Sequence, residues 1–241
     1  PGSVRDLVDR GKRQARSAQR VLLRSRERRR WVQQRHTQSP PLRQALAADV
    51  AMTLHFRGEG RPDLSRTELA LEAVRLSWSS DAFLAQVLYR ARISALRRGV
   101  PGLPRVLHLG SMVLSQVCIG DPVIVKPGLY IPHGQIVVDG ITEVGSDVIL
   151  FPWSTVGLRG GNFQGPAIGD GVHVGTGAKV IGAVAVGRAA RIGANAVVVS
   201  DVAAGATAVG VPARTSRVDA GEGDLRPRPD MVGKTAGGAL C

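Results

Sequence analysis

The sequence is poor in aromatic residues and in cysteine, and it lacks a long apolar run. Aromatics make up 4% of the 241 residues, so large rings cannot dominate the core. Two cysteines, Cys118 and Cys241, are too few for a disulfide framework and favour a reducing compartment. No apolar stretch approaches the roughly 18 residues that cross a bilayer, and no signal segment opens the chain. We therefore predict a soluble cytoplasmic protein with no membrane partner.

Positive charge is abundant but uneven. The formal net charge is +13, and residues 1–40 hold 12 Arg and Lys against 3 Asp and Glu. Such a block can bind nucleic acid or another polyanion, or it can be a solvated helix face. The block has one aromatic residue, Trp31, and no nucleic-acid reader motif. We favour the solvated face and expect no nucleic-acid partner.

An aliphatic residue returns about every six positions through the C-terminal half. A period of six is neither the two of ordinary strands nor the 3.6 of helices, and it indicates three short strands per coil of a prism. Each buried Val or Ile contributes about 1.5–3 kcal/mol, so stacked rungs can form a core without aromatics. The thirteen rung residues are Ile119, Val125, Ile131, Val138, Val144, Leu150, Val156, Ile168, Val174, Val180, Val186, Ile192 and Val198.

The N-terminal half has helical patterning. Ser65 and Glu68 form a predicted capping box, and Gly99 and Pro101 are a helix stop after Arg97-Arg98. The helices are expected over about 4–36, 41–53, 66–77, 81–98 and 103–116.

Four segments follow from these patterns, and the expected class is α+β. The first three residues, Pro1-Gly2-Ser3, are typical of a cleaved tag. The last segment is rich in Gly, Pro and charge and has no period, so we expect a mobile tail. The segments are a basic helical arm (1–40), a helical domain (41–117), a parallel β-helix of hexapeptide repeats (118–217) and the tail (218–241).

Several motifs resemble serine O-acetyltransferases, a branch of the hexapeptide-repeat acyltransferases. They are GPAIGDGVHVGTGAKVIG at 165–182, IGANA at 192–196, VGVPAR at 209–214 and GLYIPHG at 128–134, and the likeness covers about residues 41–217. The resemblance implies a left-handed β-helix and a homotrimer that binds coenzyme A between neighbouring β-helices. Whether two trimers associate through the helical half stays open.

The resemblance also implies roles for individual residues. His133 stands where the family has its catalytic base, and an imidazole that titrates near neutral pH can take the proton of a hydroxyl attacking a thioester. His173 is expected to be a spectator. The predicted contacts to the pantetheine arm of acetyl-CoA are Thr176 and Ala194, and Ala194 is alternatively only a small corner residue. The predicted contacts to the phosphates are Lys179, Arg214 and Arg217, which are alternatively solvated surface cations.

The likeness fails at the residues that hold serine in the family. Cys118 stands in place of the carboxylate that orients the histidine, Pro132 replaces an Asp, and Gln164-Gly165 replaces an Arg-His pair. One residue fewer separates His133 from Val138 than in the family. The acceptor is therefore predicted to differ from free serine, with an amino-acid derivative, a sugar or a specialised metabolite as candidates. The alternative is that free serine is held by different residues. The carboxylates that could orient His133 instead are Asp121, Asp139 and Glu143. Cys118 itself is disfavoured as a nucleophile.

Three hypotheses remain. The first is an acetyl-CoA-dependent O-acyltransferase that acts on a small hydroxyl acceptor. The second is a non-catalytic β-helix scaffold whose basic arm binds a polyanion or a protein. The third, a zinc hydratase, needs three histidines, and the repeats contain only His133 and His173, so we predict no metal.

Overall fold

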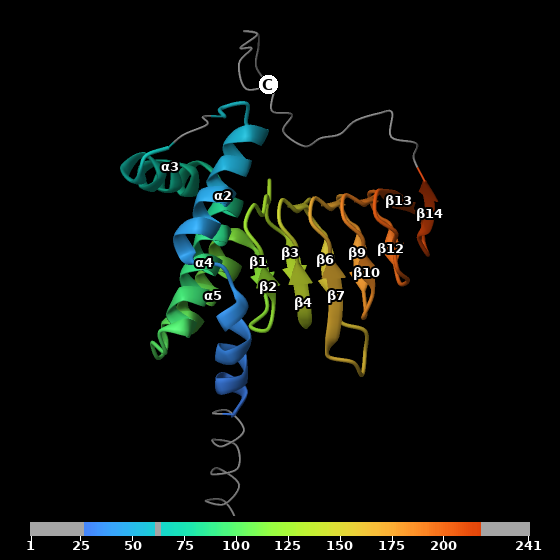
Figure 1. Ribbon diagram of the computed structural model, residues 1–241, viewed down its shortest axis with the longest axis horizontal. Coiled ribbons are helices and arrows are strands. Elements are labelled where there is room, and N and C mark those ends of the chain that lie inside the picture. The colour runs from blue at the N-terminus through green and yellow to red at the C-terminus, as the bar shows by residue number, and fades with distance from the viewer. Residues whose placement is uncertain (1–26, 61–63, 218–241) are drawn as a thin grey trace, which may run out of the picture.

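The computed structural model describes residues 27–60 and 64–217 (Figure 1). Helices come first in the chain. The four helices predicted between residues 41 and 116 are confirmed, with ends that agree to within a few residues. The predicted basic helix is described only from residue 27, and the predicted tail lies outside the described residues. After a helix over 27–35, the elements are η1 (His36–Gln38), α2 (Leu42–Phe56), α3 (Arg66–Ser79), α4 (Asp81–Arg97) and α5 (Leu103–Ser115).

The predicted helix signals are present in the structure. The Ser65 side chain accepts a hydrogen bond from the Glu68 backbone, and the Ser65 backbone N–H donates to the Glu68 carboxylate at 2.9 Å. Gly99, just after α4, has a φ of +70°, which a residue with a side chain rarely adopts. Among the described residues, no helix is both long enough and apolar enough to span a membrane.

The second half of the described chain is a stack of short strands. They are β1 (Val117–Ile119), β2 (Ile124–Val125), β3 (Ile136–Val138), β4 (Ile141–Val144), β5 (Ile149–Leu150), β6 (Thr155–Gly157), β7 (Gln164–Ile168), β8 (His173–Val174), β9 (Lys179–Ile181), β10 (Ala185–Val186), β11 (Arg191–Ile192), β12 (Val197–Val198), β13 (Ala206–Val209) and β14 (Arg214–Arg217).

These strands form three sheets. Sheet A has the order β1-β3-β6-β9-β12, sheet B has β10-β7-β4-β2, and sheet C has β14-β13-β11-β8-β5. All pairs within them are parallel except β13 with β14. From β3 to β12 successive strands visit sheets A, B and C in turn. The chain therefore winds as a three-sided coil, as the six-residue period predicts.

The coil has a narrow aliphatic core. All thirteen rung residues named in the sequence are buried, and none is more than 4% exposed. Small residues stand two positions before many of them, and those at Thr142, Ser154, Ala178, Ala190 and Ala196 are also buried. Close packing of Val, Ile, Ala and Thr thus replaces the missing aromatics.

A buried ion pair joins the helices to the coil. Asp49 of α2 accepts two hydrogen bonds from Arg90 of α4, at 2.8 and 3.0 Å, and both residues are buried. The same carboxylate accepts the backbone N–H groups of Gly128 and Leu129, at 3.0 and 2.9 Å. Arg90 also donates to the carbonyl of Val125 at 2.6 Å. One side-chain pair therefore fixes two helices against the first coil.

The described part of the basic segment is docked on the coil. His36 is buried, with Nδ1 2.9 Å from the Ser39 hydroxyl and Nε2 2.7 Å from the Asp121 carbonyl oxygen. Arg35 donates to the Pro122 carbonyl at 2.7 Å and pairs with Glu143 at 3.2 Å. Residues 27–39 are thus part of the packed structure.

Asp49→Ala should strongly destabilise the protein. Removing the carboxylate leaves the buried Arg90 charge and two backbone N–H groups without partners, which costs about 3–5 kcal/mol. Urea unfolding followed by circular dichroism measures this loss. Glu59→Ala is the matched control, because its pair with Arg75 is partly exposed and should contribute about 1 kcal/mol or less. Equal losses for the two variants would contradict the assignment.

Candidate active site

His133 lies on an exposed corner of the coil. Tyr130 pairs with Ile149, 19 residues later, whereas Val137 pairs with Thr155, 18 residues later. The corner between them, where sheet C meets sheet A, therefore holds one residue more than the next coil. The extra residue is in the same short segment as His133, which is exposed.

The residue after His133 must be a glycine. A Cβ at Gly134 would collide with the carbonyl oxygen of Ser115, at the end of α5. Close backbone contact thus supports the corner from behind, and His133 is displayed on a fixed base.

Thr176 and Ala194 lie on the same edge of the coil as His133. Gly177 donates its backbone N–H to the Pro152 carbonyl at 2.9 Å, and Asn195 donates to the Thr176 carbonyl at 2.8 Å. Because β3 pairs in parallel with β6, the His133 corner before β3 lies next to the Pro152 corner before β6. Successive coils are about 4.8 Å apart, so the three steps from the His133 corner to Ala194 span about 14 Å. We call this line of corners the His133 edge.

Two of the three predicted phosphate-binding cations can be placed near this edge. Lys179 is in β9 of sheet A, and its ammonium group donates to the carbonyl of Trp153 on the edge itself. Arg214 is exposed and pairs with Val209 where sheet C ends beside the edge. Arg217 closes β14, and its side chain lies outside what the structure describes.

Within one chain, the predicted carboxylates do not meet His133. Asp139 follows β3, whereas His133 precedes it, and the strand between them rises about 3.3 Å per residue. Glu143 is paired with Arg35 instead. Asp121 lies 4.0 Å from both Arg28 and Arg92. An orienting carboxylate from this set would have to come from another copy of the chain.

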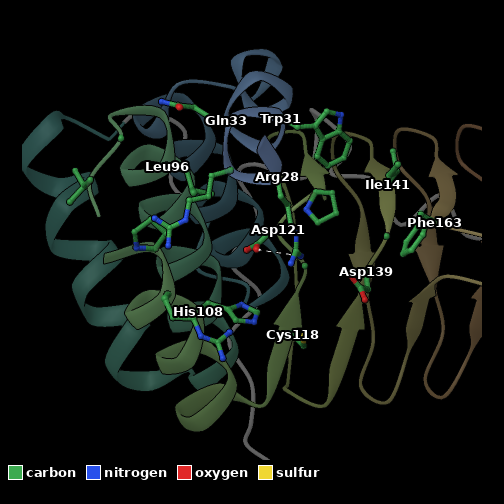
Figure 2. Close-up of a pocket in the computed structure, with 18 of the residues that line it drawn as sticks. Arg28, Trp31, Gln33, Leu96, His108, Cys118, Asp121, Asp139, Ile141 and Phe163 are labelled. Carbon is green, nitrogen blue, oxygen red and sulfur yellow. Dashed lines mark ion pairs between the residues drawn. The ribbon is translucent and has the colours of Figure 1, made fainter. Parts of the chain in front are cut away.

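A large cavity lies between the helices and the first coils, and we call it the seam cavity (Figure 2). Its volume is about 1100 Å³. The helix over 27–35, α5, the turns that follow β1 and β3, and the loop over 158–163 form its walls. His133 does not line it. The charged and sulfur-containing lining residues are Arg28, Arg29, Arg105, His108, Cys118, Asp121 and Asp139.

Cys118 is held as a neutral thiol in this cavity. Burial raises its pKa, and the Asp139 carboxylate raises it further, while Arg92 acts in the opposite direction. No cation stands near Cys118 in the sequence, so sequence reasoning missed Arg92. The net shift still agrees with the expectation that Cys118 is not a nucleophile.

His108 is the cavity residue that sequence reasoning left without a role. Its Nδ1 lies 2.6 Å from Nη1 of Arg92, and burial followed by the charge of Arg92 lowers the pKa of His108. The sequence feature that could have indicated a role is its position three residues after Arg105, because residues three apart share one helix face.

Comparison with known proteins identifies the family. The chain is 37% identical to a serine acetyltransferase of Mycobacterium tuberculosis over 189 residues, covering 76% of this chain and 82% of that protein. This chain belongs to the serine acetyltransferase family. It is also 41% identical over 140 residues to a serine acetyltransferase of Helicobacter pylori, covering 56% of this chain and 77% of that one. No protein-family profile matches the sequence.

Solved structures of serine acetyltransferases share the fold. The Neisseria gonorrhoeae serine acetyltransferase in complex with serine aligns with a TM-score of 0.60 and 27% identity, covering 76% of this chain and 72% of that one. A serine acetyltransferase in complex with CoA aligns at 0.61 and 27%, covering 76% and 73%. The prediction of an O-acetyltransferase is confirmed, and the CoA complex agrees with acetyl-CoA as co-substrate. Among the described residues, no cluster of side chains suits a metal ion.

Alkylation kinetics should show the control of Cys118 by Asp139. Asp139→Asn removes a negative charge that favours the neutral thiol, so the pKa of Cys118 falls and more thiolate is present at pH 8. Iodoacetamide should therefore modify Cys118 several-fold faster in this variant, as followed by peptide mass spectrometry. Glu72→Gln, on α3, is the control and should leave the rate unchanged. A slower reaction in Asp139→Asn would contradict the electrostatic assignment.

Proposed function

We propose that this protein transfers the acetyl group of acetyl-CoA to the hydroxyl group of an acceptor other than free serine, with His133 as general base. The observation that supports it is the His133 edge. An exposed histidine lies on a corner of the coil, and the predicted pantetheine contacts follow it along the same line.

The chemistry needs one base at the reacting end of the cofactor. A ring nitrogen of His133 takes the hydroxyl proton while the acceptor oxygen bonds to the thioester carbonyl carbon. The C–S bond then breaks, and the proton passes from the imidazolium to the departing CoA thiolate. Such a base typically supplies about 10²–10⁴-fold, and positioning on the edge supplies more.

The edge has the length and the polar groups that an extended cofactor needs. Backbone groups at Thr176 and Ala194 lie in line with His133, so the pantetheine arm can run along them. Lys179, Arg214 and Arg217 would then meet the phosphates through charge-assisted hydrogen bonds. The arm and the phosphates together place the thioester at the His133 end.

The structure supports a changed acceptor. The Neisseria relative binds serine, but here the amide of Gln164 donates to the carbonyl of Ile141 at 3.2 Å. Gly165 has no side chain, and Cys118 is a neutral thiol. None of these three positions therefore offers a charged group to the carboxylate or ammonium of free serine.

We also propose the left-handed coil and the homotrimer that the resemblance implies. α5 exposes a row of apolar side chains immediately before β1 of sheet A, and a folded monomer rarely leaves such a row in water. In a three-fold assembly, Asp139 of one copy could orient His133 of the next. The exposed apolar side chains of α5 are Leu103, Val106, Leu109, Met112, Val113 and Leu114.

His133→Ala should abolish acetyl transfer. With acetyl-CoA and a panel of hydroxyl acceptors, release of free thiol should fall by at least about 100-fold, because the proton acceptor is lost. His173→Gln is the control and should stay within threefold of the parent protein. Normal turnover by His133→Ala would refute the mechanism. If calorimetry shows no binding of micromolar CoA, the non-catalytic scaffold is favoured.

Val113→Asp should break the trimer. Val113 is 75% exposed on α5, so the change should not harm the fold of one chain, whereas a buried carboxylate at a subunit contact is costly. Light scattering coupled to gel filtration should show the mass falling from three chains to one. Leu71→Asp, at a 69% exposed position on α3, is the control and should leave the mass at three chains. An unchanged mass for Val113→Asp would place the contact elsewhere.

A further inference from the structure

We infer that the seam cavity binds the acceptor, and that it selects a bulky hydroxyl compound with a carboxylate, of the N-acylated serine type, over free serine. The inference rests on the proposed function, because it names the acceptor class of the same reaction. His133 of this chain does not line the cavity, so the acceptor would react with His133 of the neighbouring copy, which the proposed trimer places beside Asp139. The inference depends on the size of the cavity, on one fixed hydrogen-bond donor with a guanidinium on the same helix face, and on the apolar wall.

Within one chain, the cavity is far larger than a free amino acid. Its volume of about 1100 Å³ is at the upper end of sites for drug-sized ligands. A molecule as small as serine would leave most of this space to water and touch only one wall. A bulky substituent on the acceptor would fill the remainder.

One end of the cavity holds a fixed donor. A guanidinium can only donate hydrogen bonds, so Nδ1 of His108, 2.6 Å from Arg92, must be the acceptor of that bond. The ring is therefore neutral and carries its proton on Nε2. Arg92 is itself 2% exposed and donates to the Gly120 carbonyl at 3.1 Å, so the arrangement is rigid.

A second donor stands beside the first. Arg105 precedes His108 by three residues on α5, so both side chains share one helix face, and both line the cavity. Nε2–H of His108 makes no hydrogen bond to the described residues. A neutral N–H next to a guanidinium is suited to a carboxylate, which accepts hydrogen bonds only.

The charge balance favours an anion. Arg28, Arg29 and Arg105 face the cavity, against the carboxylates of Asp121 and Asp139. Asp121 already lies 4.0 Å from Arg28, as the dashed line in Figure 2 marks. Arg92 adds a buried positive charge behind Gly120.

Most of the remaining lining, apart from Gln33, is apolar and comes from both halves of the protein. Trp31 and Leu96 face it from the helices, and Ile141 and Phe163 from the coil (Figure 2). Trp31 is 43% and Phe163 78% exposed, so both have surface to bury against a ligand. An acyl or aryl substituent would provide that contact.

Calorimetry with N-benzoyl-L-serine tests the inference without acetyl-CoA. This probe should bind at least tenfold more tightly than L-serine. Arg105→Gln should weaken it at least tenfold, because a carboxylate partner is lost. Val100→Trp should also weaken it, because an indole at this 38% exposed lining position occupies the cavity. Arg43→Gln, an exposed position of α2 that does not line the cavity, should change binding less than twofold.

The outcomes separate this inference from the proposed function. Equal binding of L-serine, or unchanged binding in both Arg105→Gln and Val100→Trp, would overturn the acceptor assignment. Thiol release from acetyl-CoA with L-serine as the better acceptor would also overturn it, while leaving acetyl transfer intact. Binding with the expected variant pattern but without thiol release from acetyl-CoA would leave the cavity as a carboxylate-binding site and overturn its role as the acceptor site.

Discussion

The contact between Asp49 and Arg90 is the constraint on which the arrangement of the molecule depends. Neither charge can be buried alone, and together with the backbone of residues 125–129 they satisfy each other. The pair holds α2 and α4 at one distance from the first coil. α4 in turn reaches the seam cavity through Leu96 near its end, so a structural ion pair anchors one of the helices that line the proposed acceptor site.

The coil could be predicted from the sequence because its determinants are local and periodic. Each rung residue is buried for the same reason as the one before it, and thirteen repeats of one pattern leave little freedom. The helix ends at Ser65 and Gly99 were predictable for a similar reason, since capping involves residues a few positions apart. His133 was predicted from its motif, and the extra corner residue was already visible as a spacing of seven between Ile131 and Val138.

The seam cavity could not be predicted in this way. Its walls come from residues 28 to 163, and nothing in the sequence indicates that Arg92 points at His108 or that residues 27–39 lie against the turn after β1. Such contacts depend on how the helices are packed against the coil. The same applies to the carboxylates: Asp139 and Glu143 are near His133 in the sequence, but a strand and an ion pair keep them from it within one chain.

The additional residue at the His133 corner has a wider consequence. Ile131 and Val138 both point into the core although they are seven apart, so the corner absorbs a change in chain length that the interior does not experience. In a three-sided coil, the exposed residues at a corner can therefore change without altering the packing of the buried rung residues. A corner can gain or lose a residue, and with it a reactive group, while every rung above and below keeps its neighbours. This separation explains how one stable scaffold can accommodate different reactive groups at its edges.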